Sequence, residues 1–119
     1  MAIQDQIFWF GEGDAWFRRN REKLRDVEND WPVALLLSLP LKEREYEVLE
    51  LGCSNGWRLH KLAGLMNGRF WGVDASPAAI EDGRTRYPEL ELRRGLLSEV
   101  SLKQEFDIVI VNYVLHWVD

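Results

Sequence analysis

Two short apolar segments, each followed by a characteristic group of residues, constrain the fold of this chain most strongly. The first, VLELGCSNGW at residues 48–57, passes from an apolar stretch into a turn of small residues. The second, FWGVDAS at residues 70–76, is also apolar and reaches an acid, Asp74. In open parallel sheets, ligands bind outside the carboxyl ends of the strands. The two segments therefore predict neighbouring strands with a ligand site at their ends.

The turn of small residues in the first segment leaves room for a ligand. Gly52, Ser54 and Gly56 have little side-chain bulk, and glycine also permits backbone angles closed to other residues. Asp74 can accept hydrogen bonds from both hydroxyls of a ribose. The pattern favours a ligand that carries a ribose.

Strand and helix patterns alternate along the rest of the chain. The predicted elements are strands at 46–51, 69–73, 90–93 and 106–111, and helices at 57–66 and from Ser76-Pro77 to near Tyr87. The unbroken apolar run at 108–111 is typical of a central parallel strand covered on both faces. This alternation predicts an α/β fold, a Rossmann-like parallel sheet with flanking helices and right-handed crossovers.

The N-terminal residues 1–45 are predicted to form a helical arm or cap, ahead of a partial Rossmann-like domain at 46–119. We expect an irregular start, then a helix near 18–26, where Arg18 and Glu22 have i,i+4 spacing. A second helix is predicted at 31–39, with a proline in its first turn.

Two interpretations of the arm remain open. Its basic cluster is typical of a solvated helix face. Alternatively, Trp9, Trp16 and Arg19 form a flap over the ligand, with the arginine meeting a carboxylate.

Composition limits the class of protein. The 119 residues are 46% hydrophobic and 29% charged, as in a single soluble globular domain. A net charge of −5 argues against a nonspecific nucleic-acid binder. No apolar run approaches the roughly 20 residues that span a bilayer, so no membrane partner is expected. The single cysteine, Cys53, suits a reducing, cytoplasmic location and serves as a small residue in the turn.

The two motifs resemble the cofactor site of the class I S-adenosylmethionine-dependent methyltransferases. The resemblance covers residues 48–119 and implies S-adenosyl-L-methionine as cofactor and a small-molecule methyl acceptor as partner. In the family an acid at the position of Glu50 helps to hold the cofactor's amino-acid end, and Ser76 or its neighbour borders the adenine. The implied cofactor-binding residues are Glu50, Gly52, Cys53, Ser54, Gly56, Asp74, Ala75, Ser76, Leu96, Leu97 and Asn112. No metal site is expected.

The chain departs from the family pattern after the third strand. There, family members often carry an acid that contacts the adenine amino group. This chain has RGLLSEV at 94–100, which offers backbone groups and an apolar wall but no acid at the usual place. Ser98 and Glu99 are the nearby alternatives.

Residues after the fourth strand supply the candidates for catalysis. His116 is the candidate general base because its pKa lies near neutrality, with a packing role as the alternative. A carboxylate acceptor would need no base. Trp117 is expected to line the acceptor pocket or the core.

Two short similarities bear on the acceptor. FWFGEGDAWFRRN at 8–20 is similar to methylases associated with pseudaminic acid biosynthesis. VNYVLHWVD at 111–119 is similar to small-carboxylate O-methyltransferases such as those acting on trans-aconitate. These similarities imply a sugar or a carboxylate as acceptor.

Family members continue past the fourth strand with three more strands of a seven-stranded sheet. The chain is therefore expected to be a fragment that lacks those strands, or else an unusually short protein. An exposed apolar edge near 106–118 predicts self-association or a missing partner segment. One alternative function is a catalytically inactive adenosylmethionine-binding or scaffolding module. Another is a dinucleotide-dependent oxidoreductase, but the G-x-G-x-x-G fingerprint fails at Ser54 and Trp57.

Overall fold

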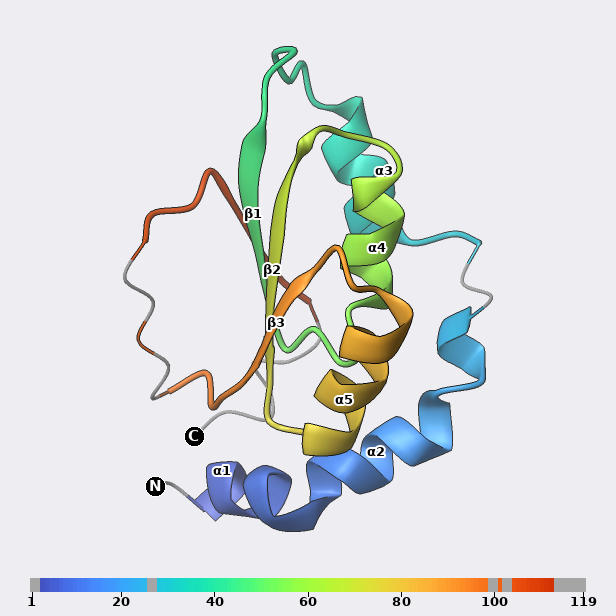
Figure 1. Cartoon of the computed structure of the whole chain (residues 1–119), viewed down its shortest axis with the longest axis vertical. Helices are drawn as coiled ribbons and strands as arrows, with labels where there is room; N and C mark the ends of the chain where they lie inside the picture. The colour runs from blue at the N-terminus through green and yellow to red at the C-terminus, as the bar shows by residue number, and fades with distance from the viewer. Residues whose placement is uncertain (1–2, 26–27, 99–100, 102–103, 113–119) are drawn as a thin grey trace.

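A four-stranded parallel sheet forms the centre of the molecule. The computed structural model describes residues 3–25, 28–98, 101 and 104–112. The strands are β1 (Tyr46–Leu51), β2 (Gly68–Asp74), β3 (Glu91–Arg94) and β4 (Ile108–Val111), in the order β3-β2-β1-β4. All three strand pairings are parallel, and Figure 1 shows the sheet with its helices alongside. The predicted Rossmann-like α/β fold is confirmed.

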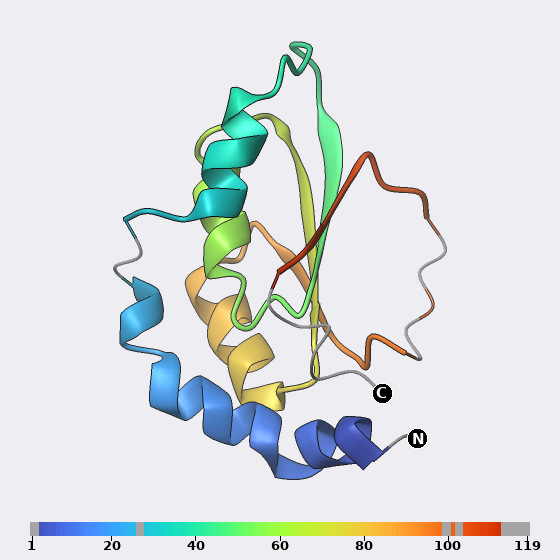
Figure 2. The same ribbon diagram turned by 180° about the vertical axis from the view of Figure 1, so that it is seen from behind.

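Three helices pack against one face of this sheet: α3 (Trp31–Ser38), α4 (Trp57–Ala63) and α5 (Pro77–Arg86). Figures 1 and 2 show all three on the same side of the strands. Alternate strand residues point toward these helices, so that Val48 and Phe70 are paired neighbours in the same core cluster. Leu59 and Leu62 of α4 meet them from the other side and are fully buried. The core therefore lies between the sheet and these helices.

Local sequence signals account for the helix ends. The Ser76 side chain accepts a hydrogen bond from the Ala79 backbone N–H at 3.0 Å, and Pro77 occupies the first turn of α5. Asp30 caps α3 in the same way through the Val33 backbone N–H. Helix α4 ends at Ala63, earlier than the predicted residue 66, because the chain tightens into a turn at Gly64.

The predicted placement of the fourth strand as a central strand covered on both faces is wrong. Strand β4 lies at the edge of the described sheet and pairs with β1 alone. Ile110 faces the core, whereas the side chains of Val109 and Val111 on the opposite face are 53% and 39% exposed. A run of apolar residues is compatible with a strand that is buried on both faces. Burial of both faces also requires a layer of helices or other structure on each side of the sheet.

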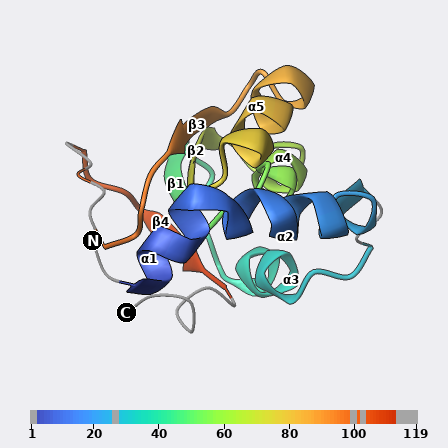
Figure 3. The ribbon, with the colours of Figure 1, turned by 90° about the horizontal axis from the view of Figure 1, so that it is seen from below.

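The N-terminal arm is helical from its first described residue, so the predicted irregular start is wrong. It consists of α1 (Ile3–Ile7), a π-helical turn η1 (Phe8–Glu12), α2 (Gly13–Asn20) and a 3₁₀ turn η2 (Lys23–Arg25). Figure 3 shows α1 and α2 crossing beneath the carboxyl ends of the strands. None of the helices in the described part of the chain is long and apolar enough to cross a membrane.

Tertiary contacts explain why the arm folds against the sheet. Asp14 Oδ1 of α2 accepts hydrogen bonds from Ser76 Oγ at 2.5 Å and from the Ala78 backbone N–H at 3.1 Å. The Arg94 guanidinium donates to the Trp9 carbonyl at 2.6 Å. Local sequence patterns cannot report contacts between residues so far apart in the chain, and these contacts outweigh weak local propensity.

Candidate cofactor-binding site

The turn that joins β1 to α4 has an unusual backbone. Three alternate residues have positive φ angles: Gly52 at 74°, Ser54 at 55° and Gly56 at 87°. Positive φ is easy for glycine and uncommon for serine. The backbone N–H groups of Gly52 and Cys53 both donate to the Val73 carbonyl, at 2.8 and 3.1 Å. The turn is therefore tied to the end of β2, and its first two N–H groups are already used.

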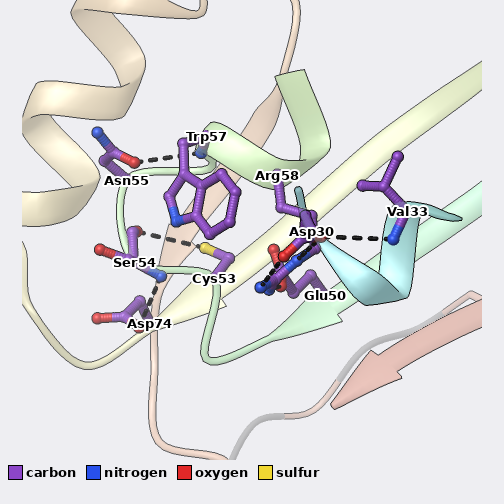
Figure 4. Close-up of polar contacts among 9 residues, drawn as sticks. All are labelled: Asp30, Val33, Glu50, Cys53, Ser54, Asn55, Trp57, Arg58 and Asp74. Atoms are coloured by element: carbon purple, nitrogen blue, oxygen red, sulfur yellow. Dashed lines mark hydrogen bonds and ion pairs between the residues drawn. The ribbon is translucent and has the colours of Figure 1, made fainter. Parts of the chain in front are cut away.

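Asp74 ends β2 directly beside this turn. Its Oδ1 accepts a hydrogen bond from the Ser54 backbone N–H at 2.9 Å (Figure 4). Its Oδ2 accepts one from the Ser76 backbone N–H at 3.1 Å. Burial raises the pKa of this carboxyl above its ordinary value, while the two N–H donors act in the opposite direction. A carboxylate oxygen can accept more than one hydrogen bond, so both oxygens can still receive a ligand hydroxyl.

A cavity of about 460 Å³ lies beneath the strand ends, between the turn and the N-terminal arm. Of the predicted cofactor-binding residues, those that line it are Gly52, Cys53, Ser54, Asp74, Ala75, Leu96, Leu97 and Asn112. The structure thus brings together residues from the ends of all four strands. His116 lies outside the described residues, so its role stays a prediction.

Three predicted residues support the cavity from behind rather than line it. Glu50 is 1% exposed, and Ser76 is fully buried as the cap of α5. Gly56 faces the core, where an added Cβ would lie 2.7 Å from Leu90 Cδ1. Their positions indicate that they shape the turn and the strand ends instead of forming the surface.

An ion-paired triad of Arg58, Asp30 and Glu50 supports one wall of the cavity, and Figure 4 shows its members in contact. The Arg58 guanidinium donates to both oxygens of Asp30, with Nε–Oδ2 at 2.7 Å and Nη2–Oδ1 at 3.0 Å, and its Nη1 donates to Glu50 Oε2. Arg58 also lines the cavity. The Arg58 side chain is directed inward rather than into solvent, because it pairs with two buried carboxylates.

Glu50 has an unusual electrostatic environment within this triad. Burial raises the pKa of Glu50 from its ordinary 4.5 to about 7, even though Arg58 acts to lower it. Its second oxygen, Oε1, is buried without a hydrogen-bond partner among the described residues. Buried polar atoms are normally paired, so this oxygen is an exception behind the cavity wall.

The arm supplies cavity residues that the sequence patterns did not identify. Asp5, Phe8, Gly13 and Leu24 line it together with Trp16, the one member of the expected flap that does so. Trp9 instead stacks against Arg94, with the guanidinium carbon 3.5 Å from the ring centroid, and Arg19 pairs with Glu12. The tryptophans at positions 9 and 16 indicated that the arm contributes to the site. No sequence pattern indicated that Asp5 would line the cavity.

Cys53 and Trp57 complete the region around the turn. The Cys53 side chain is 2% exposed, and burial raises the pKa of its thiol well above the ordinary range. A buried thiol that resists ionisation is a poor nucleophile, which agrees with a space-filling role for this residue. Trp57 lines the cavity, and its ring lies against the Arg58 guanidinium at 4.6 Å.

Comparison with protein families gives a match over most of the sheet. Residues 48–119 match the family model described as a methyltransferase domain. Trans-aconitate 2-methyltransferase of Escherichia coli is 31% identical over 90 residues, covering 71% of this chain and 34% of that protein. A probable S-adenosylmethionine-dependent methyltransferase of Mycolicibacterium smegmatis is 34% identical over 67 residues, covering 56% of this chain and 26% of that protein. The match thus spans about one third of the length of the first relative and about one quarter of the second.

Solved structures show the same likeness. An S-adenosylmethionine-dependent methyltransferase from Mesorhizobium loti superposes with a TM-score of 0.63 at 27% identity, covering 75% of this chain and 42% of that one. The fold is also that of the magnesium protoporphyrin IX methyltransferase from Synechocystis, solved with bound SAH. Its TM-score is 0.76 at 18% identity, covering 94% of this chain and 59% of that one.

Proposed function

Because the chain belongs to the methyltransferase domain family, we propose that its cavity binds S-adenosylmethionine for methyl transfer to a small-molecule acceptor. The observation that carries this proposal is the position of Asp74. Its carboxylate stands between the open turn and the cavity, with two oxygens held in place by backbone N–H groups. A ribose diol has the matching pair of donors.

The cavity walls on the two sides of Asp74 differ in polarity, as do the two ends of S-adenosylmethionine. Because β2 lies between β1 and β3, Asp74 separates the triad of Arg58 from the leucines that follow β3. Arg58, which lines the cavity, suits the carboxylate of the donor's amino-acid end, and Glu50 supports this arginine from behind. Leu96 and Leu97 suit the flat adenine ring.

When bound, S-adenosylmethionine supplies an electrophilic methyl group. The protein's contribution is then mainly alignment, since proximity and orientation account for much of the acceleration in such reactions. Asn112 lines the cavity after β4, where an acceptor can approach. We retain His116 as the proposed base for an acceptor that must lose a proton, and a carboxylate acceptor requires none.

The acceptor that we propose is a sugar or a small carboxylate. The similarity of residues 8–20 to pseudaminic acid-associated methylases supports the first, and the likeness to trans-aconitate 2-methyltransferase supports the second. We place the protein in the cytoplasm because its single cysteine is buried and free. We propose no nucleic-acid partner because the net charge is −5.

We further propose self-association of this chain through β4, with a second copy as the partner. Val109 and Val111 expose apolar side chains on an edge strand, and such edges tend to pair with other strands. Light scattering over a range of concentrations should show a mass that rises above that of the monomer. A constant monomer mass at high concentration would remove this proposal.

The same geometry disfavours a dinucleotide as the ligand. A pyrophosphate is bound by free backbone N–H groups at the start of a helix. Here the N–H groups of Gly52, Cys53 and Ser54 already donate to Val73 and Asp74.

Calorimetry with S-adenosylmethionine, S-adenosylhomocysteine and NAD tests the proposal directly. We expect both adenosyl ligands to bind and NAD not to bind. Preference for NAD would overturn the proposal, whereas adenosyl binding without methyl transfer would identify a binding or scaffolding module.

A further inference from the structure

Asp5 is a buried carboxylate for which the proposed function has so far given no role. It lies on α1, its residue is 4% exposed, and it lines the cavity. Its Oδ2 accepts a hydrogen bond from Ser98 Oγ at 2.5 Å. No cationic side chain pairs with it in the part of the chain that the structure describes. A carboxylate removed from water with one hydrogen-bond donor is costly unless a further donor is supplied.

The contact with Ser98 places Asp5 within the cavity. Ser98 directly follows Leu96 and Leu97, the apolar part of the cavity wall. The arm is anchored at the same end of the sheet, because the Arg94 guanidinium donates to the carbonyls of both Trp9 and Ala75, at 2.6 and 2.9 Å. Asp5 therefore stands at the leucine wall, which lies on the far side of β2 from Arg58.

The leucine wall and the Asp5 carboxylate together favour a particular chemical group on the ligand. The leucines favour a flat apolar ring, and the carboxylate accepts hydrogen bonds but cannot donate them when ionised. A ring with an exocyclic amino group satisfies both conditions. A ring with a carbonyl oxygen in the same place would set two acceptors against each other, which leaves both unpaired and weakens binding.

We infer that Asp5 recognises the 6-amino group of the donor's adenine, with Oδ1 accepting from the amine while Oδ2 is held by Ser98. This inference rests on the proposed function, because it requires the adenosyl group in this cavity. It means that the N-terminal arm supplies the acid at the wall formed by Leu96 and Leu97. The arm would then act as part of the binding site as well as a cover for it.

A structural role for Asp5 predicts something different. If its carboxylate only ties α1 to the loop after β3, its loss should loosen the arm and weaken every ligand of the cavity alike. Recognition of the amine predicts a change in preference between ligands. The two roles are therefore separated by comparing ligands that differ at this one group.

The experiment measures dissociation constants for S-adenosylhomocysteine and for S-inosylhomocysteine, in which a carbonyl oxygen replaces the 6-amino group. The wild-type chain should prefer the adenosyl ligand by roughly 10- to 100-fold, the range for a hydrogen bond to a charged group. The Asp5→Asn variant should lose most of this preference, because an amide can present either its oxygen or its NH₂ group. The Ser98→Ala variant should keep the preference, because the carboxylate remains.

Asp14→Ala is the matched control on the same arm. Asp14 ties α2 to the start of α5, so its removal should weaken both ligands by the same factor. Equal binding of both ligands by the wild-type chain, or an equal loss of both in Asp5→Asn, would overturn the inference and leave the proposed donor site intact. Binding of neither ligand by the wild-type chain would overturn the donor site and the inference together.

Discussion

The Arg58 guanidinium donates two hydrogen bonds to the Asp30 carboxylate, at 2.7 and 3.0 Å, although the residues lie 28 positions apart in the chain. Their side chains are only 9% and 7% exposed, and the same guanidinium also contacts Glu50. One cation therefore joins the segment before α3, strand β1 and helix α4. The fold and the position of Arg58 in the cavity wall depend on the same three side chains.

We predict that Asp30→Asn lowers the free energy of unfolding by up to about 3 kcal/mol. Breaking a buried ion pair is strongly destabilising, and the loss is limited here because Glu50 remains as a partner of Arg58. Urea denaturation measures the effect. Arg44→Gln is the control, because it breaks the exposed Arg44–Asp107 pair and should change stability far less. Equal effects of the two variants would contradict the prediction.

The buried carboxyl of Glu50 should make stability depend on pH. Its pKa in the folded chain, about 7, lies above its ordinary value of 4.5. Protonated Glu50 therefore stabilises the fold, and this contribution is complete below about pH 4.5 and lost as the pH rises through about 7. The charged groups that act on Glu50 are Arg58, Asp30 and Asp74.

We predict that Glu50→Gln removes this dependence. The stability of the variant relative to the wild-type chain should rise between mildly acidic and mildly alkaline pH, by on the order of 3 kcal/mol. Parallel unfolding curves at a series of pH values measure the difference. A constant difference across the series would show that Glu50 does not titrate in this range.

Asp74 should control donor affinity. Asp74→Asn keeps the size of the side chain but removes the charge and one acceptor, so the affinity for S-adenosylhomocysteine should fall by about 1.5–3 kcal/mol. Calorimetry measures this change directly. Glu89→Gln removes the same charge from an exposed residue that pairs with His60 outside the cavity, and it should leave the affinity unchanged.

Much of the sheet could be predicted because its signals are local. Strand β1 has the predicted bounds Tyr46–Leu51, and α5 begins after Ser76 and ends before Pro88. A cap, a proline and an apolar run each act on their own few residues, so the sequence alone carries that information. The small residues of the turn are equally local, and Gly52, Ser54 and Asp74 do meet around one cavity.

The remainder depends on contacts between distant segments. No pattern near Arg58 reports that Asp30 will lie beside it, and no pattern near Asp5 reports Ser98, which is 93 residues away. The helical start of the arm likewise follows from its docking on Ser76 and Arg94. Burial of polar residues was hardest to foresee, because each requires a partner supplied by the tertiary fold.

Gly83 of α5 packs closely against the turn that joins β1 to α4. A Cβ at this position would lie 2.1 Å from the Asn55 carbonyl oxygen, inside the turn, and 2.5 Å from Leu92 Cδ1. Alanine is normally better than glycine in a helix by about 1 kcal/mol, but overpacking costs about 1–3 kcal/mol, so Gly83→Ala should destabilise the fold. It should also weaken binding of S-adenosylhomocysteine by displacing the turn. Gly64→Ala, whose Cβ would meet only Lys61 O at 3.6 Å, should do neither, and thermal denaturation with calorimetry compares the pair.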